Sequence, residues 1–235
     1  EFDRMKPGLD QKDSWQYLQE MLPLVQDLWQ GDVAHEGRFW QFPSATSCPK
    51  PLQQTVSMWV AARSPITFDY AVANDCNIMS WPLTLPFSEA EKYRTQLDLA
   101  IAKNGGTYKG RFAMMRHTSV YENANDRQSA LDATRGVLSQ FGNLIMKSGE
   151  VRNGFPDPVP LESLDGNFRV EPKMLEDNLM FGAPSQVIDK LGKYQEIGVD
   201  AFIYYASMGL GMEQQQRSLQ LFIENVMPAF NNRKS

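Results

Sequence analysis

The sequence predicts an α/β fold built on a parallel sheet. Strand-like and helix-like segments alternate along the 235 residues, and there is no internal repeat or low-complexity tract. The strand-like segments are short and mostly apolar, as strands buried on both faces are. Each is followed by apolar residues at helical spacing. Four such units are compatible with a small doubly wound sheet or with half of an eight-stranded βα barrel, and periodicity does not choose between them.

Four segments are expected to form the sheet: residues 57–61, 77–81, 112–121 and 201–205. Half of a barrel would leave two open sheet edges and an apolar interior. If the fold is a half barrel, we therefore expect residues outside this chain to complete it.

The helices are expected from apolar periodicity and from capping residues. Ser88 and Glu91 form a capping box ahead of a helix over residues 89–103, and Asn125 is expected to cap a helix over 126–141. The other expected helices cover residues 14–29, 67–74, 171–180, 185–196 and 213–226.

Two stretches lack a regular pattern. Residues 31–54 are expected to be irregular, because their prolines exclude a helix. The proline-rich residues 147–181 are too long for a plain connection, so we expect an insertion or a lid at the mouth of the barrel. The whole chain, residues 1–235, is expected to form a single partial-barrel domain.

Composition and charge argue against several classes of function. The net charge of −5 and the scattered basic residues argue against nucleic-acid binding. No apolar stretch is long enough for a membrane span. Cys48 and Cys76 are expected to be reduced, as in a cytoplasmic protein. His35 and His117 lack the spacing of metal ligands, so no metal site is expected. For both histidines we favour a structural role over a catalytic one.

The end of the first strand is a candidate anion site. Ser64 is a plausible helix cap, and Pro65 suits the first helical position. Backbone N–H groups, the hydroxyls of Ser64 and Thr67 and the guanidinium of Arg63 would converge there and suit a phosphate. The alternative is ordinary capping beside a surface arginine. Gly209 and Gly211 form a weaker candidate, for which a flexible turn is favoured.

Three motifs in order resemble the bacterial-luciferase-like family of flavin-dependent monooxygenases. They are Val33–Trp40 with Phe42, then Pro49-Lys50-Pro51 leading to Trp59 and Ser64, and Phe181-Gly182-Ala183-Pro184 before the last helix–strand pair. The resemblance implies a (β/α)8 TIM-type barrel of which this chain holds the C-terminal half, strands five to eight. The principal catalytic residues are then expected upstream of residue 1.

The resemblance also assigns binding residues. Arg63, Ser64 and Thr67 match positions that hold the flavin phosphate, although luciferase itself has an acid where Arg63 stands. Ser80 and Trp81 match a stretch that walls the flavin and substrate pocket. The aromatic and methionine residues near the strand ends suit an apolar substrate, with barrel packing as the alternative for each: Met79, Trp81, Phe87, Tyr204 and Tyr205.

The implied function is oxygenation of a small, apolar organic substrate by O2 with reduced flavin mononucleotide (FMN) from a separate flavin reductase. The resemblance further implies a homodimer of the full protein. Two alternatives stay open. One is the family's deazaflavin-dependent dehydrogenases or reductases, and the other is an inactive flavin-binding fragment.

Overall fold

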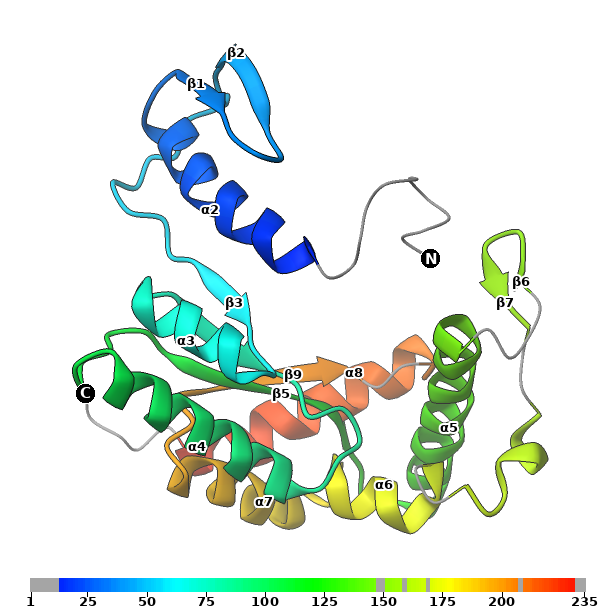
Figure 1. Ribbon diagram of the computed structural model, residues 1–235. Helices are drawn as coiled ribbons and strands as arrows, with labels where there is room; N and C mark the ends of the chain where they lie inside the picture. Colours follow the sequence, from blue (N-terminus) through cyan, green and yellow to red (C-terminus); the bar gives the residue numbers. More distant parts are fainter. Residues whose placement is uncertain (1–12, 147–150, 158–159, 168–169, 207–208, 231–235) are drawn as a thin grey trace. The chain divides into compact units, whose positions relative to one another are not determined.

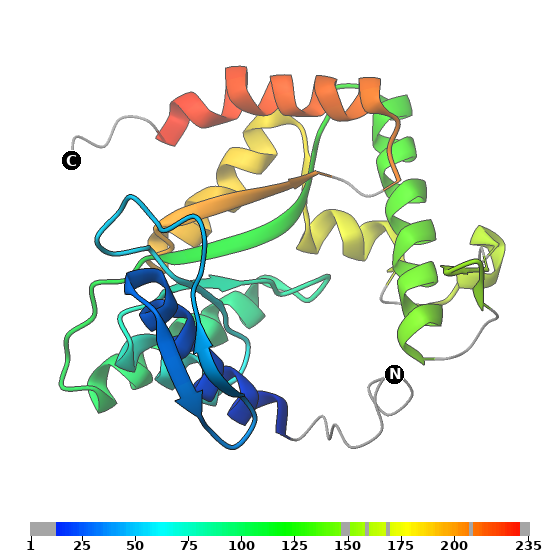
Figure 2. The same ribbon diagram turned by 90° about the horizontal axis from the view of Figure 1, so that it is seen from above.

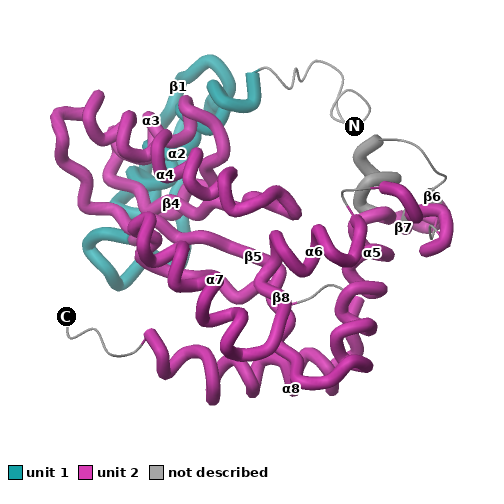
Figure 3. Tube along the Cα trace, turned by 90° about the horizontal axis from the view of Figure 1, so that it is seen from below, with its two compact units in different colours: residues 1–56 teal, residues 57–235 magenta. Residues whose placement is uncertain are grey.

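The computed structural model describes residues 13–146, 151–157, 160–167, 170–206 and 209–230. The chain divides into two compact units, Glu1–Val56 and Ser57–Ser235 (Figure 3). The single partial-barrel domain stays a prediction.

The first unit combines a helix with a two-stranded hairpin. Helix α2 (Ser14–Gln30) precedes β1 (Val33–Glu36) and β2 (Gln41–Ala45), which pair antiparallel. The hairpin lies inside residues 31–54, where we expected irregular structure. That expectation was wrong for these strands, because proline excludes a helix but is tolerated in the edge strands of a two-stranded pair.

One carboxylate fixes the turn of this hairpin. Glu20, on α2, accepts hydrogen bonds from the backbone N–H groups of Phe39 at 3.2 Å and Trp40 at 3.0 Å. Its Oε1 also lies 3.2 Å from Nε2 of His35. The residues of this motif therefore stabilise the local fold, which agrees with the structural interpretation of His35.

The second unit contains a five-stranded sheet in which every pairing is parallel (Figure 1). Its strands are β3 (Trp59–Ala61), β4 (Asn77–Ser80), β5 (Phe112–Val120), β8 (Met180–Gly182) and β9 (Ala201–Ala206). Four of them confirm the predicted strands to within two residues at each end. The fifth, β8, begins where the predicted helix over residues 171–180 was expected to end.

Two strands share one edge of the long central strand β5. Ala113 pairs with Met79 of β4 and with Ala201 of β9, so β4 and β9 lie on opposite edges of β5. Thr118 pairs with Met180 of β8 and also with β9, so β8 is on the same edge as β4. Figure 2 shows β9 running beside β5. The order β3–β4–β5–β9 follows the sequence, as in consecutive βα units.

Helices follow the strands. They are α3 (Pro65–Ala73), α4 (Phe87–Lys103), α5 (Ala124–Met146), α6 (Pro172–Asn178), α7 (Pro184–Glu196) and α8 (Met212–Leu221), and α8 continues as a π-helix over Phe222–Val226. Two predicted caps were wrong. Helix α4 begins at Phe87, after Pro86, so Ser88 lies within its first turn. The N–H of Asp126 donates to Oδ1 of Asn123 at 2.8 Å, so Asn123 takes the role assigned to Asn125.

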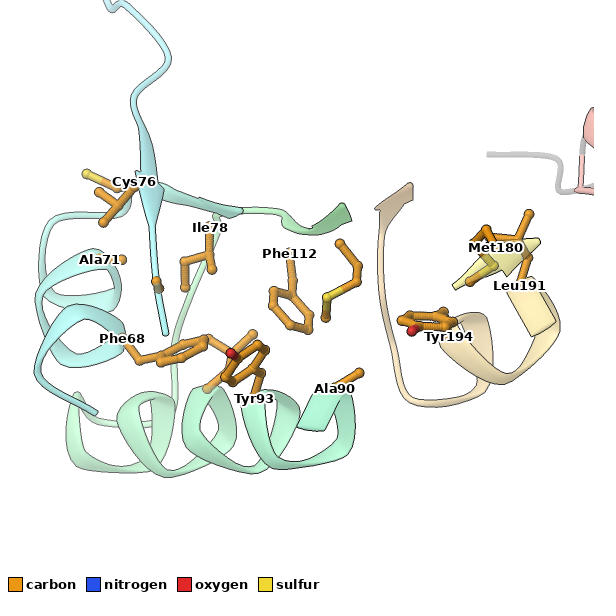
Figure 4. Close-up of a cluster of buried hydrophobic side chains, with 14 of the residues drawn as sticks. Phe68, Ala71, Cys76, Ile78, Ala90, Tyr93, Phe112, Met180, Leu191 and Tyr194 are labelled. Carbon is orange, nitrogen blue, oxygen red and sulfur yellow. The ribbon is translucent and has the colours of Figure 1, made fainter. Parts of the chain in front are cut away.

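The main core lies between the helices and one face of the sheet. Phe68 of α3 and Tyr93 of α4 meet Ile78 and Phe112 of the sheet there, and all four are at most 1% exposed (Figure 4). The same cluster contains Val60, Ala62, Met114 and Val120, together with residues of α7 and the π-helix.

Alternate residues of each strand point to the opposite face of the sheet. We call it the helix-free face, because the described helices of this unit that pack on the sheet lie on the core side. Since Ile78 and Met114 belong to the core, Met79 and Met115 face the other way, and both are partly exposed. On β9, Tyr204 packs on Phe222, which leaves Tyr205 on the helix-free face.

The segment between β5 and β8 has its own smaller core. Leu131 of α5, Leu175 and Leu179 are fully buried there beside Phe181. The described parts of residues 147–181 contain the short hairpin β6–β7 (Val151–Arg152 and Phe155–Pro156), a 3-10 turn (Leu161–Leu164) and α6. Residues 147–150, 158–159 and 168–169 of the expected lid lie outside the described residues. None of the helices described is both long and apolar enough to cross a membrane.

Candidate functional site

The turn from β3 into α3 is rich in hydrogen-bond donors. Thr67 Oγ1 accepts the N–H groups of Ser64 at 3.2 Å and Arg63 at 3.3 Å, and it donates to the Ser64 carbonyl at 2.8 Å. The two hydroxyl oxygens of Ser64 and Thr67 lie 3.3 Å apart. The first turn of α3 carries no acidic residue. The structure thus brings together the three residues that the sequence analysis placed here.

Arg63 contacts the neighbouring helix. Its Nε lies 3.3 Å from the hydroxyl of Tyr93 on α4. Arg63 as a residue is exposed, and it directly precedes Ser64 at the start of α3.

Ser80 connects this turn to the next strand. Its hydroxyl donates to the carbonyl of Ala62 over 2.6 Å, and its side chain is fully buried. Because Ala62 immediately precedes Arg63, this bond ties the end of β4 to the start of the donor-rich turn.

Trp81 belongs to a cluster of three rings, which we call the ring cluster: Trp81, His117 and Tyr205. The ring centroids are 5.4 Å apart for Trp81 and His117, 5.5 Å for Trp81 and Tyr205, and 4.6 Å for His117 and Tyr205. Trp81 directly follows β4, and the other two side chains come from β5 and β9, where they are register partners. The cluster therefore spans three strands on the helix-free face.

The ring cluster contains three buried nitrogen atoms without a hydrogen-bond partner among the described residues: Nε1 of Trp81 and both ring nitrogens of His117. Burial, with a smaller contribution from the charge of Arg116, lowers the pKa of His117 to about 4. The imidazole is therefore neutral at pH 7 and offers one donor and one acceptor.

Hydrogen bonds from Arg116 hold the loop that begins at Trp81. This fully buried guanidinium donates to the carbonyls of Leu83 at 3.0 Å and Leu85 at 2.8 Å, and its Nε donates to the hydroxyl of Tyr194 at 2.7 Å. Leu83 has a φ of 56°, a left-handed conformation that few non-glycine residues adopt. Arg116 therefore fixes the loop after β4.

A second polar group links the end of β5 to the expected lid. Glu176 of α6 accepts hydrogen bonds from the Tyr121 hydroxyl at 2.9 Å and from Arg127 at 2.5 and 2.7 Å. Hydrogen bonding to Arg127 is the main cause that lowers the pKa of Glu176.

Packing accounts for several other residues that the sequence analysis named. Tyr204 packs on Phe222, and Phe87 packs on Tyr194, so both contribute to the core side of the sheet. Gly209 has a φ of +78°, and a Cβ there would lie 3.3 Å from the Ala133 carbonyl, so conformation and close packing account for this glycine.

Sequence reasoning did not place His117 beside Trp81 and Tyr205, and it missed the contacts of Arg116. A signal was present: the run from Arg116 to Ser119 places four polar residues within an otherwise apolar strand. A strand buried on both faces carries such residues only when they have partners or a function.

Fold and site together define a parallel α/β protein with a hydroxyl-rich turn after β3 and a polar aromatic cluster on one face of its sheet. A family model described as luciferase-like monooxygenase matches residues 1–201. The chain therefore belongs to the luciferase-like monooxygenase family.

One curated relative is the oxygenase component of a flavin-dependent trigonelline monooxygenase from Acinetobacter baylyi. It is 35% identical over the whole of this chain, which spans 65% of that relative. An F420-dependent glucose-6-phosphate dehydrogenase from Nakamurella multipartita is 21% identical over 93% of this chain and 61% of its own length. The chain thus covers less than two thirds of these relatives.

Solved structures share the fold. A monooxygenase from Streptomyces bottropensis aligns with a TM-score of 0.68 at 20% identity, over 94% of this chain and 63% of that protein. An F420-dependent secondary alcohol dehydrogenase aligns with a TM-score of 0.64 at 19% identity, over 91% and 61%.

Proposed function

We propose that this chain is the flavin phosphate and substrate half of a flavin-dependent monooxygenase, with β3, β4, β5 and β9 as strands five to eight of a (β/α)8 barrel. The order and direction of the strands support this assignment, as do helices packed on one face of the sheet. Trp59, on the outermost strand β3, is 45% exposed. A completed barrel would cover this edge and the helix-free face.

The observation that carries the proposal is the donor set at the start of α3. The hydroxyls of Ser64 and Thr67, the guanidinium of the exposed residue Arg63 and the positive end of the helix lie together without an acidic neighbour in the first turn. This chemistry fits the phosphate dianion of FMN. Rotation of the Thr67 side chain about χ1 would free the backbone N–H groups of Arg63 and Ser64, which donate to Thr67 Oγ1 in this structure.

Bound reduced flavin supplies the two electrons that let O2 place one oxygen atom in an organic substrate and release the other as water. The part of this chain is to bind the phosphate, to hold the loop after β4 and to line the pocket with Trp81. The residues of the helix-free face keep water away from the reacting groups.

The test compares FMN with riboflavin, which lacks the phosphate. We expect Ser64→Ala and Thr67→Val each to weaken FMN binding about tenfold, since a hydrogen bond to a charged group contributes roughly 1.5–3 kcal/mol. Riboflavin affinity should stay within twofold. Thr95→Val is the matched control, because the Thr95 hydroxyl donates to the Glu91 carbonyl of its own helix, α4. Equal weakening of both flavins, or of neither, would refute the phosphate assignment.

Partners and substrate follow from the relative named above. Its name as an oxygenase component supports a separate flavin reductase as partner, and trigonelline is the first substrate to test. Oxygen consumption with reduced FMN and trigonelline measures turnover. Binding of FMN with no turnover on any substrate would instead support the inactive flavin-binding fragment.

The F420-dependent relatives support a second candidate, hydride transfer with a deazaflavin. Competition between the two cofactors separates the candidates. Tight binding of F420 with no binding of FMN would replace the monooxygenase by the dehydrogenase or reductase. We also propose a homodimer for the full protein, which sedimentation equilibrium would test.

A further inference from the structure

The ring cluster contains hydrogen-bonding groups that a purely hydrocarbon ligand could not pair with. His117 is fully buried, and both its ring nitrogens lack a partner among the described residues, as does Nε1 of Trp81. Leaving a buried polar group unpaired costs about 1–3 kcal/mol. Three of the six such atoms in the described part of the chain lie in two rings whose centroids are 5.4 Å apart, so the unmet hydrogen-bonding capacity is concentrated at this cluster.

The donors and acceptors of the cluster define what would pair with them. The indole of Trp81 is a donor only, and a neutral imidazole adds one donor and one acceptor. Two donors against one acceptor favour a ligand group that mainly accepts hydrogen bonds. A carboxylate accepts on both oxygens and can bond both donors at once.

The positive charge of Arg116, next to the cluster, would attract a carboxylate. Arg116 is buried on the opposite face of β5, and its bonding partners are neutral: the Tyr194 hydroxyl and backbone carbonyls. No carboxylate forms an ion pair with Arg116 in the described part of the chain. Its positive field therefore favours an anion nearby.

Aromatic and aliphatic side chains surround the cluster. The Trp81 and Tyr205 rings meet edge to face, with an interplanar angle of 75°, and aromatic rings favour this arrangement with one another. Met79, Met115 and Ile203 lie on the same face of the sheet and are partly exposed. Methionine side chains adapt well to aromatic rings.

We propose that Trp81, His117 and Tyr205 form the substrate-recognition site of this protein and that the substrate is a planar aromatic acid whose carboxylate accepts hydrogen bonds from Trp81 and His117. This inference rests on the proposed function and narrows it, because the apolar substrate expected from the sequence becomes an aromatic ring with an anionic group. Tyr205 packs against the ring of the substrate.

The two histidines of the chain make the site observable. We would label histidine with 15N and titrate the 235-residue protein with benzoate, with and without FMN. His35→Gln removes one set of ring signals and so assigns the other to His117. Benzoate should shift the His117 signals and leave those of His35 unchanged. Unchanged His117 signals at saturating benzoate would overturn the proposal.

Ligand analogues and variants test the chemistry by calorimetry. Toluene lacks the carboxylate and cyclohexanecarboxylate lacks the aromatic ring, so each should bind at least about tenfold more weakly than benzoate. Trp81→Phe keeps a ring but removes the donor, and it should weaken benzoate about tenfold while toluene affinity stays the same. His35→Gln is the matched control and should change neither.

The outcomes separate this inference from the proposed function. Benzoate binding that depends on Trp81 and His117, without any FMN binding, would support the site and refute the flavin assignment. If FMN binds and toluene binds as tightly as benzoate, the flavin assignment is supported and the recognition site is refuted. If Trp81→Phe and His117→Phe both bind benzoate like the unaltered protein, the recognition site is refuted.

Discussion

Nε of Arg116 donates a 2.7 Å hydrogen bond to the hydroxyl of Tyr194, and this bond joins the central strand β5 to helix α7 through a fully buried cation. The other guanidinium nitrogens bind carbonyls of the loop that follows β4. One side chain therefore couples the strand, the helix and the loop that carries Trp81. Because its partners are neutral, the desolvation of the charge is offset by geometry and by the number of bonds.

Replacement of Arg116 should destabilise the protein strongly. Arg116→Lys keeps the charge but cannot make the same set of bonds, so we expect the free energy of unfolding to fall by about 3 kcal/mol in urea denaturation. Arg94→Lys, at a partly exposed pair with Asp98 that also reaches the Gly198 carbonyl, should lower the urea midpoint far less than Arg116→Lys. A midpoint for Arg116→Lys equal to that control would contradict the role of Arg116.

The neutral state of His117 should give stability a dependence on pH. The unfolded chain binds a proton at His117 near the ordinary pKa of 6.5, whereas the folded protein binds it only near pH 4. The unfolded state thus holds more protons between these values, so stability falls as the pH is lowered through this window, by up to about 3 kcal/mol. Urea unfolding at pH 7, 6, 5 and 4 measures the loss.

The comparison variant for this prediction is His117→Phe, which cannot bind a proton and should flatten the profile between pH 6.5 and 4. His35→Gln should keep the slope of the unaltered protein. The explanation fails if the slope disappears with His35→Gln instead.

The group around Glu176 should hold α6 against α5. Glu176→Gln removes the charge that Arg127 and Tyr121 contact, so we expect faster hydrogen exchange in residues 172–178 and about 1 kcal/mol less stability. Since the folded pKa of Glu176 is lowered, its contribution is present above the ordinary value of 4.5 and is lost as the pH falls. Asp177→Asn should not change the exchange rates, because Asp177 pairs with Lys173, an exposed residue of the same helix.

Ser80 should contribute more to the stability of the fold than to the binding of FMN. Ser80→Ala leaves the buried Ala62 carbonyl without this donor, and we expect a loss of about 1–2 kcal/mol in unfolding free energy. FMN should bind within threefold of the unaltered protein once the variant is folded. A loss of FMN affinity as large as that of Ser64→Ala, without a change in unfolding, would show instead that Ser80 contacts the cofactor directly.

The sheet could be predicted from the sequence because its main strands are compact apolar runs followed by amphipathic helices. β8 could not, because the three residues from Met180 to Gly182 are too few to show a strand pattern. The hairpin β1–β2 was hidden by Pro43, whose cost depends on whether a strand is central or at an edge.

The turn at Ser64 could be predicted because its residues are neighbours in the sequence. The ring cluster could not, since His117 and Tyr205 lie on β5 and β9, Trp81 follows β4, and the register of these strands brings the three together. Arg116 was equally hidden, because its partners in the loop and on α7 are set by tertiary packing.

The sharing of one edge of β5 by two strands has a consequence for how the family could diversify. The chain leaves the sheet at Tyr121 and returns at Met180, and the N–H of Tyr121 bonds the Gly182 carbonyl at 3.1 Å. Residues 121–179 thus form an insertion whose two ends are adjacent at the edge of the sheet. Such an insertion can be lengthened, shortened or exchanged between relatives without any change in strand register.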